Sequence, residues 1–310
     1  MASRLGIDVG GTKCLAVRLD DDGEIVASER RPTPKDPSEL VDRLCELFDV
    51  VGPAETMGVG VPGLVTREGM FRAAPHINRV ADLHLRELLE ERLGRRVVVD
   101  NDATCALVAE SAIGVAKDVD DAVLVTLGTG IGGAVLAGGV IQRGANGFVG
   151  EIGHMVVDPN GPDCPCGRRG CWERFASGSA LARFGREAAE AGRLPGVLNM
   201  TGSEPAAIRG EDVTAAARAG DPGALMILDT FGRWVAIGLV NLTNLLDPEL
   251  FVLGGGLVGL HDLVVDPIRH WFGELLYAPD YRPHPRLEVA RLAERSGAIG
   301  AALLPATVPA

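Results

Sequence analysis

Short apolar runs alternate with amphipathic helical segments along most of the chain. The apolar runs predict strands over residues 5–9, 15–19, 24–28, 57–61, 97–99, 122–127, 134–137, 140–142 and 250–253. Apolar positions at helical spacing predict helices over residues 38–50, 85–93, 103–112, 181–191, 224–246 and 296–304. Strands that alternate with helices indicate an α/β fold.

One arrangement of strands occurs twice, about 120 residues apart. A strand, a glycine turn, a strand, a tight turn and a third strand follow one another over residues 5–28 and again over 122–142. We interpret the repeat as two related α/β lobes that face each other, although glycine turns between strands are common enough for a chance likeness. We expect residues 1–115 to form a small lobe, with a C-terminal helix over 296–310 packing back onto it, and residues 116–295 to form a large lobe.

Composition and charge narrow the class of protein. The 310 residues carry 30 basic and 42 acidic side chains, a formal net charge of -12, and 46% of them are hydrophobic. This hydrophobic content excludes a disordered chain, and the acidic balance disfavours nucleic acid and anionic membranes as partners. The first residues lack the pattern of a signal peptide, and no apolar run approaches the roughly 18 residues that cross a bilayer. We therefore expect a cytoplasmic protein.

Three of the six cysteines are clustered. Cys164, Cys166 and Cys171 lie in a region rich in glycine and proline, and His154 precedes them. Three thiolates and one imidazole complete a tetrahedral set for zinc, with no position left open for water. We predict a structural zinc site that orders an insertion over residues 144–173, the alternative being free cysteines in a loop.

Three glycine turns that follow strands are candidates for nucleotide binding. Glycines let backbone N–H groups close around phosphate oxygens, and a carboxylate at the end of the first strand, Asp8, could hold magnesium through water. Ordinary hairpin turns are the alternative, and the sequence has no P-loop pattern. The candidate residues are Asp8, Gly10, Gly11, Thr12, Lys13, Gly128, Thr129, Gly130, Gly254, Gly255 and Gly256.

Acidic side chains lie beside two of the predicted elements. Asp102 follows the strand over residues 97–99, where it could act as a base on a hydroxyl, or merely cap the next helix. Glu151 and Glu173 flank the cysteine cluster in sequence and could accept hydrogen bonds from sugar hydroxyls, or be solvated surface residues.

Together these motifs resemble the ROK family of sugar kinases over nearly the whole chain. The most specific part is residues 150–154, Gly-Glu-Ile-Gly-His, followed by residues 164–173, Cys-Pro-Cys-Gly-Arg-Arg-Gly-Cys-Trp-Glu. The resemblance implies a two-lobed actin-like or hexokinase-like ATPase fold of the ribonuclease H-like type. It also implies ATP-dependent phosphorylation of a hexose, most often glucose at its 6-hydroxyl, with Asp102 as the base.

The resemblance further implies where the ligands bind. ATP and magnesium would occupy the glycine turns, zinc would be structural, and the lobes would close around the sugar in a homodimer or homotetramer. His154 would serve both zinc and sugar. The implied sugar-binding residues are Gly63, His76, Asn78, Asn101, Asp102, Glu151, His154 and Glu173.

Two positions depart from the family pattern and leave the sugar open. His76 stands where the family usually has Asn, with Asn78 two places on, and Thr104 also replaces Asn. Kinases for N-acetylmannosamine, N-acetylglucosamine, allose or fructose share the same motifs and are alternatives to a glucokinase. Polyphosphate-dependent glucokinases tend to lack the zinc motif, which favours ATP here.

Two non-enzymatic alternatives are weaker. ROK regulators carry a DNA-binding segment before the first strand, whereas seven residues precede Asp8 here, so we expect no DNA binding. A catalytically silent sugar-binding module would be expected to have lost Asp102 or the phosphate-binding glycines, and all of them are present.

Overall fold

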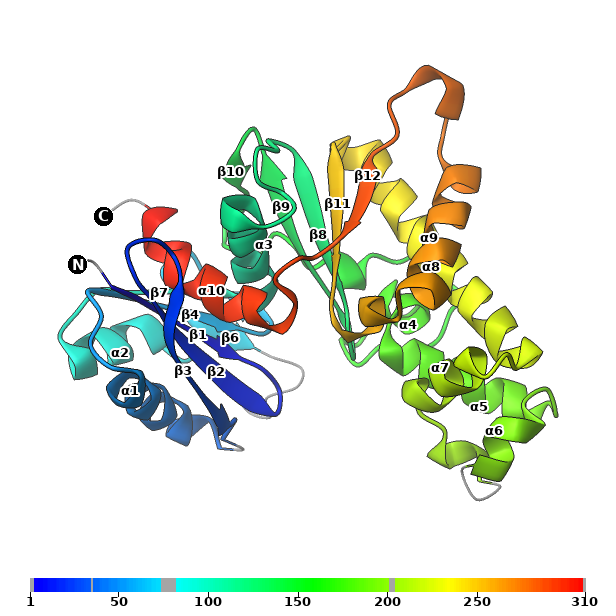
Figure 1. The fold of residues 1–310 in the computed structure, drawn as a ribbon, viewed down its shortest axis with the longest axis horizontal. Coiled ribbons are helices and arrows are strands. Elements are labelled where there is room, and N and C mark those ends of the chain that lie inside the picture. Colours follow the sequence, from blue (N-terminus) through cyan, green and yellow to red (C-terminus); the bar gives the residue numbers. More distant parts are fainter. Residues whose placement is uncertain (1–2, 35, 74–81, 201–203, 309–310) are drawn as a thin grey trace. The chain divides into compact units, whose positions relative to one another are not determined.

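The computed structural model describes residues 3–34, 36–73, 82–200 and 204–308, which divide into two compact units (Figure 1). The first unit comprises Met1–Leu124, Gly133–Glu151 and Ala290–Ala310. The second unit comprises Val125–Gly132 and Ile152–Val289. The lobe limits expected from the sequence stay predictions.

A five-stranded mixed sheet forms the centre of the first unit. Its strands are β1 (Arg4–Val9), β2 (Lys13–Leu19), β3 (Ile25–Pro32), β4 (Thr56–Val61) and β7 (Val97–Asn101). Their order is β3-β2-β1-β4-β7, in which β2 is antiparallel to both its neighbours, and β4 is parallel to β1 and β7. The carboxyl ends of β1, β4 and β7 therefore lie at one edge of the sheet, where an α/β lobe usually binds its ligand.

Helices cover both faces of this sheet. On one face, α1 (Leu40–Val51) and α2 (Leu85–Leu93) form a hydrophobic core with the buried residues of β1, β4 and β7. On the other face lie α3 (Asp102–Ile113) and α10 (Ser296–Leu303). Gly6 and Gly58 allow α10 to lie directly on the strands, because a Cβ atom at either position would be 2.0 Å or less from an α10 carbonyl oxygen. The hairpin β5 (Leu64–Val65) and β6 (Phe71–Ala73) is separate from the sheet.

A second five-stranded sheet has the order β10-β9-β8-β11-β12. Its strands are β8 (Ala122–Leu127), β9 (Ile131–Ala137), β10 (Val140–Ile141), β11 (Leu250–Gly254) and β12 (Arg286–Val289). Numbered along the chain, both sheets have their strands in the order third, second, first, fourth, fifth. The internal repeat expected from the sequence is thus confirmed at the level of sheet topology.

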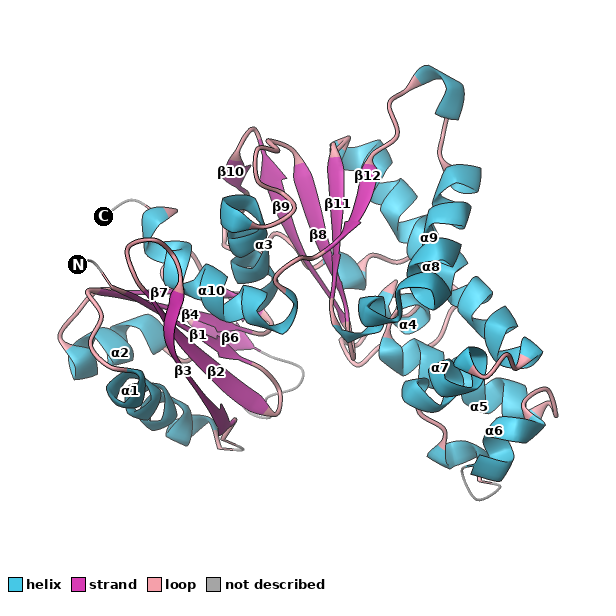
Figure 2. Cartoon of the chain, viewed as in Figure 1, coloured by secondary structure: helices cyan, strands magenta, loops and turns pink. Residues whose placement is uncertain are grey.

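Six of the ten α-helices in the described residues belong to the second unit, and Figure 2 shows the helices in cyan. They are α4 (Glu173–Ala176), α5 (Gly178–Glu190), α6 (Pro195–Met200), α7 (Gly210–Arg218), α8 (Pro222–Leu246) and α9 (His261–Leu275). Short 3-10 helices are found at Pro37–Glu39, Ile152–His154, Pro205–Ala207, Gly256–Leu260, Pro279–Tyr281, Ala293–Arg295 and Leu304–Ala306.

Helix α8 is the longest helix of the described residues. By length and composition it is apolar enough to cross a membrane, although polar residues interrupt its C-terminal half. In the structure 56% of its most apolar window is buried inside the protein, as in the core helix of a globular protein. Gly232 packs against Pro267 of α9, where a Cβ atom would be 2.6 Å from the proline Cβ.

The predicted strands and helices are all present, with limits shifted by a few residues. Elements β5, β6, β12, α4, α6, α7 and α9 were not expected. The pattern of α9 is interrupted by Pro267, and β12 contains no fully buried residue, so neither has a strong periodic signal.

Candidate functional site

The turn between β7 and α3 presents the candidate base. Asn101 has an extended backbone and caps α3, because its Oδ1 accepts hydrogen bonds from the amides of Ala103 (2.9 Å) and Thr104 (3.2 Å). Its Nδ2 donates to the carbonyl of Gly63 at 3.0 Å, which fixes the turn to the loop after β4. The cap is therefore Asn101, and Asp102 is the first residue of the helix.

A buried ion pair between Asp100 and Arg143 stabilises this turn. Asp100 accepts a hydrogen bond from the Asn101 amide at 2.8 Å through Oδ1 and one from Arg143 Nε at 2.7 Å through Oδ2. The side chains of Asp100 and Arg143 are only 8% and 16% exposed. Arg143 Nη2 also donates to Thr307 Oγ1 at 2.9 Å, so the arginine joins the turn to the C-terminal segment.

Burial and neighbouring carboxylates change the proton affinity of Asp102. Burial, and secondarily the charges of Asp8 and Glu151, raise the pKa of Asp102 to about 7. Burial also raises the pKa of Asp8 to about 6, against an opposing effect of the Lys13 charge. A carboxylate with a pKa near 7 binds a proton far more readily than an ordinary aspartate, which is what a general base at neutral pH requires.

The first glycine turn lies between β1 and β2. The Gly10 amide donates to the Lys13 carbonyl at 2.9 Å, and Thr33 Oγ1 donates to the Gly10 carbonyl at 2.7 Å. Gly11 has open space around its missing side chain, and Lys13 Nζ lies 3.1 Å from Glu294 Oε2. Asp8 comes just before the turn and packs against Gly297 of α10, where a Cβ atom would be 2.7 Å from the Asp8 carboxyl carbon.

The second glycine turn, Gly128–Thr129–Gly130, is held by the start of α5. The Gly178 amide donates to the Gly128 carbonyl at 2.8 Å, and Ser179 Oγ donates to the Thr129 carbonyl at 2.8 Å. A helix N-terminus beside a glycine turn favours an anion such as a phosphate. Gly178 and Ser179 were missed in the sequence, although a Ser-Gly-Ser run before a helical pattern is a signal for such a cap.

Two further predicted residues in the second unit have defined positions. Glu173 Oε2 accepts a hydrogen bond from the Ile131 amide at 3.0 Å, directly after the second glycine turn. Gly255 has a φ of +89°, and a Cβ atom there would be 2.4 Å from the carbonyl oxygen of Leu127. Only glycine allows the end of β11 to approach β8 this closely, and the adjacent Gly256 leaves its surroundings open.

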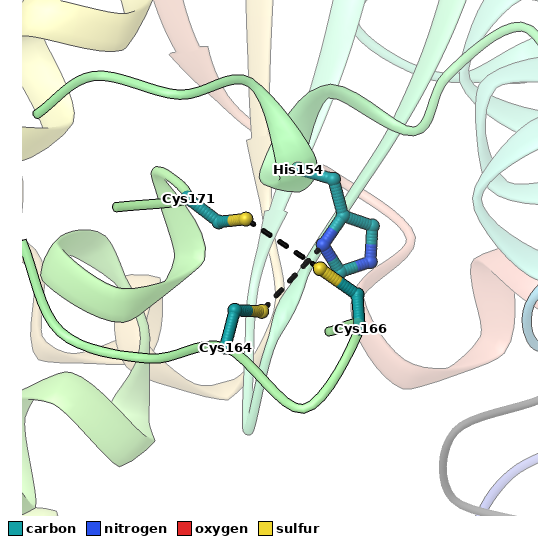
Figure 3. A group of neighbouring side chains, drawn as sticks. All are labelled: His154, Cys164, Cys166 and Cys171. Atoms are coloured by element: carbon teal, nitrogen blue, oxygen red, sulfur yellow. Dashed lines mark hydrogen bonds between the residues drawn. The ribbon is translucent and has the colours of Figure 1, made fainter. Parts of the chain in front are cut away.

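His154, Cys164, Cys166 and Cys171 form one cluster (Figure 3). Their ligand atoms all lie within 4.8 Å of one another, with Cys166 Sγ 3.6 Å from Cys171 Sγ and Cys164 Sγ 3.9 Å from His154 Nδ1. Ligand bonds of 2.0–2.3 Å to a tetrahedral zinc ion place neighbouring ligand atoms roughly 3.5–3.8 Å apart. The cluster therefore has the donor set of a closed metal site, with two separations close to the tetrahedral values and the others no longer than 4.8 Å.

The backbone around the cluster is shaped by glycines. The Gly167 amide donates to the Cys164 carbonyl at 3.0 Å and has a φ of +84°, which closes the turn that presents Cys164 and Cys166. Gly170 has a φ of +73°, and a Cβ atom there would be 1.6 Å from the Asp158 carbonyl oxygen. The following Trp172 is fully buried and donates to the Trp234 carbonyl at 2.8 Å, which anchors this segment to α8.

The structure brings the candidate residues together in two groups. Within the first unit, Gly63, Asn101, Asp102, Asp8 and Glu151 belong to one neighbourhood, linked by the hydrogen bonds and charge effects given above. Within the second unit, the second and third glycine turns and Glu173 are neighbours. The predicted residues His76 and Asn78 lie outside the described residues, and Thr104 is buried in α3.

These features define an α/β protein of the hexokinase-like fold class, with two sheets of equal strand order, glycine turns after their first strands and a His-Cys₃ cluster. The chain belongs to the ROK family, whose model matches residues 4–307. The family resemblance and the fold class expected from the sequence are both confirmed.

Individual relatives agree with this assignment. The glucokinase of Streptomyces coelicolor is 36% identical over 308 residues, which are 97% of each chain. The crystal structure of a ROK family glucokinase from Streptomyces griseus, in complex with glucose and AMPPNP, is 36% identical, covers 98% of this chain and 99% of that one, and has a TM-score of 0.87. The xylose repressor of Bacillus subtilis is 30% identical over 285 residues, covering 88% of this chain and 69% of the repressor.

Proposed function

We propose that this protein is an ATP-dependent sugar kinase of the glucokinase type, which converts glucose to glucose 6-phosphate. The observation that carries the proposal is a half-buried aspartate with a pKa of about 7, Asp102, directly after the parallel strand β7. The glucokinase relatives, which match almost the entire chain, support the same reaction.

Asp102 would act on the acceptor hydroxyl of the sugar. In its ionised form, the carboxylate would accept the hydroxyl proton as the oxygen attacks the terminal phosphorus of ATP, while the bond from this phosphorus to the bridging oxygen breaks and ADP leaves. The carboxyl group would release the proton to water after the sugar phosphate has left. The Asn101 cap and the Asp100–Arg143 pair hold the backbone of this turn, so the base needs little reorganisation when the sugar binds.

The glycine turns would bind the nucleotide. Backbone amides of residues 10–13 and 128–130, with the N-terminus of α5 beside the second turn, would hold phosphate oxygens, and Gly254–Gly256 would lie along the adenosine. Magnesium bound through water at Asp8 would supply charge neutralisation for the transferred phosphoryl group.

The His-Cys₃ cluster would hold zinc in a structural role. Its four donors are all protein side chains, so a tetrahedral ion there has no position left for water or substrate, and the metal would order residues 144–173. His154 would in addition contact the sugar.

Glucose is the proposed substrate because the Streptomyces griseus relative binds glucose. The proposed sugar contacts are Gly63, His76, Asn78, Asn101, Glu151, His154 and Glu173. Thr104 is buried, so its substitution for the usual Asn would affect the sugar only through the packing of α3. We further propose a cytoplasmic homodimer or homotetramer.

The test is ATP-dependent ADP release with magnesium against glucose, fructose, allose, N-acetylglucosamine and N-acetylmannosamine. Preferred turnover of glucose would support the proposal. Preferred turnover of another sugar would keep the kinase and move the specificity to His76 and Asn78. No turnover of any sugar would refute the proposal and favour a regulator, since one of the relatives is named a xylose repressor.

A further inference from the structure

A cavity of about 550 Å³ lies within the first unit, on the side of β7 that pairs with no described strand. Its walls come from the β5–β6 hairpin, α2, β7, β10 and the segment at Thr307. Asp102 and the glycine turns do not line it. The volume is in the range of roughly 300–1,000 Å³ that holds small-molecule ligands.

The charged residues of the cavity are mainly basic. Four arginines and two carboxylates line it, a formal surplus of two positive charges in a chain whose net charge is -12. The residues are Arg67, Arg86, Arg96, Arg143, Glu90 and Asp100. A local basic pocket in an acidic protein attracts anions, because the opposite charge is concentrated where low-dielectric walls reduce screening.

Several of these charges already have protein partners. Arg143 pairs with Asp100, Arg96 donates to the Val308 carbonyl at 3.3 Å, and Glu90 accepts from the Val97 amide at 3.0 Å. The two arginines at the hairpin differ from these. Arg86 is partly buried and its Nε is buried with no hydrogen-bond partner among the described residues, and Arg67 is exposed.

A buried guanidinium nitrogen without an acceptor is costly, so an anion in the cavity that accepts from Arg86 would stabilise it. Five other arginine Nε atoms of the described residues are also buried without a partner, and what distinguishes Arg86 is its place in the wall of the basic cavity. Glu68 is the carboxylate whose pKa the charges of Arg67 and Arg86 help to lower. Its side chain is fully exposed, so water screens its attraction to the two arginines and it does not replace a ligand in the cavity. Gly69, with a φ of +78°, lets the Arg86 side chain pack against the hairpin: a Cβ atom there would be 2.8 Å from Arg86 Cβ.

We propose that this cavity is a second ligand site, which binds a phosphate monoester through Arg67 and Arg86. A guanidinium fork matches two phosphate oxygens, and a dianion matches the surplus of two positive charges. The remaining volume would accommodate the organic part of a small phosphorylated metabolite. The product of the proposed reaction is of this class, although the site does not depend on that reaction.

The position of the cavity connects it to the base. Asp100 and Arg143 form part of its wall, and Asp100 accepts a hydrogen bond from the amide of Asn101, the residue before Asp102. An anion in the cavity that attracts the Arg143 guanidinium would weaken its ion pair with Asp100, which holds the turn before Asp102. Occupancy would therefore lower the turnover of sugar, with the phosphate monoester acting as an inhibitor that does not compete with glucose or ATP.

The test is isothermal titration of the full chain with inorganic phosphate and with glucose 6-phosphate, in the presence of saturating glucose and a non-hydrolysable ATP analogue. With the sugar and nucleotide sites filled, the wild type should still bind one equivalent. Arg67→Gln and Arg86→Gln should each weaken binding by roughly tenfold or more. The matched control is Arg92→Gln, on α2 like Arg86. The exposed Arg92 side chain pairs with Asp42 outside the cavity, so this substitution should not change the affinity.

The location is checked by hydrogen exchange. Bound phosphate should protect residues 65–70 and 86–98 in the wild type and not in Arg67→Gln, an exposed substitution that leaves the fold intact. Both arginine variants should keep the sugar turnover of the wild type when no phosphate is added. Absence of binding with the other sites filled, equal affinity in all variants, or binding of citrate in place of both phosphates would overturn the proposal.

Discussion

Arg143 offers the most direct test of what stabilises the turn between β7 and α3. Replacing it with methionine keeps an apolar stem of similar length but leaves the Asp100 carboxylate without its counter-charge. Asp100 is 8% exposed, and removal of one partner of a buried ion pair typically costs about 3–5 kcal/mol of stability. An exposed pair contributes about 0–1 kcal/mol, so Arg92→Met, which breaks the pair with Asp42 at 54% and 68% exposure, is the matched control.

The loss should depend on pH in a defined direction. Burial raises the pKa of Asp100 above its ordinary value, and Arg143 opposes this effect, so Arg143→Met raises that pKa further. A carboxyl group whose pKa is higher in the folded than in the unfolded state destabilises the fold as the pH rises from the unfolded-state pKa to the folded-state pKa. The deficit of Arg143→Met should therefore be larger at pH 8 than at pH 5.

The assay is urea unfolding followed by circular dichroism at both pH values. Arg143→Met should lose several times more stability than Arg92→Met at pH 8, and the second substitution Asp100→Asn should restore much of it, because an amide removes the buried charge and its Oδ1 can still accept from the Asn101 amide. Equal losses in the two arginine variants, or a larger deficit at pH 5, would refute the reasoning.

Three further outcomes are expected. The kcat/KM for the sugar should fall about tenfold for each pH unit below an apparent pKa near 7, because Asp102 must be ionised to accept the proton. A kcat/KM independent of pH between 5.5 and 8 would exclude this base. Cys166→Ser should lose bound zinc and thermal stability whereas Cys45→Ser, outside the cluster, should retain the metal; equal metal content by mass spectrometry would contradict the site. Gly238→Ala should lower the free energy of unfolding by about 1–3 kcal/mol, because its Cβ would lie 2.0 Å from the buried ring of Trp172. Gly273→Ala, which has open space around it, should stabilise α9. Similar melting temperatures of the two variants would contradict the packing at Gly238.

Local sequence patterns were sufficient to predict much of the fold and the residues of the His-Cys₃ cluster. The strands of both sheets have strong apolar runs, and three cysteines close together in sequence can reach one ion because the turn at Gly167 brings them together. The first and second glycine turns are likewise local, since each lies between consecutive strands of a hairpin.

Contacts between distant parts of the chain could not be predicted in the same way. Arg143 pairs with Asp100 across 43 positions, and the start of α5 supports the turn at Thr129 from 50 positions away. No periodicity indicates either contact, because both arise only when separate elements pack. The distinction between Asn101 as the cap and Asp102 as the first helical residue is a matter of one position, which helix patterns do not resolve.

The proposed role of Asp102 in sugar phosphorylation is tested most directly by Asp102→Asn. The amide keeps the shape of the side chain but cannot accept the hydroxyl proton, so glucose turnover with ATP should fall by about 10²–10⁴-fold while glucose still binds with near wild-type affinity by titration. Turnover within a few-fold of the wild type would contradict the assignment of Asp102 as the base.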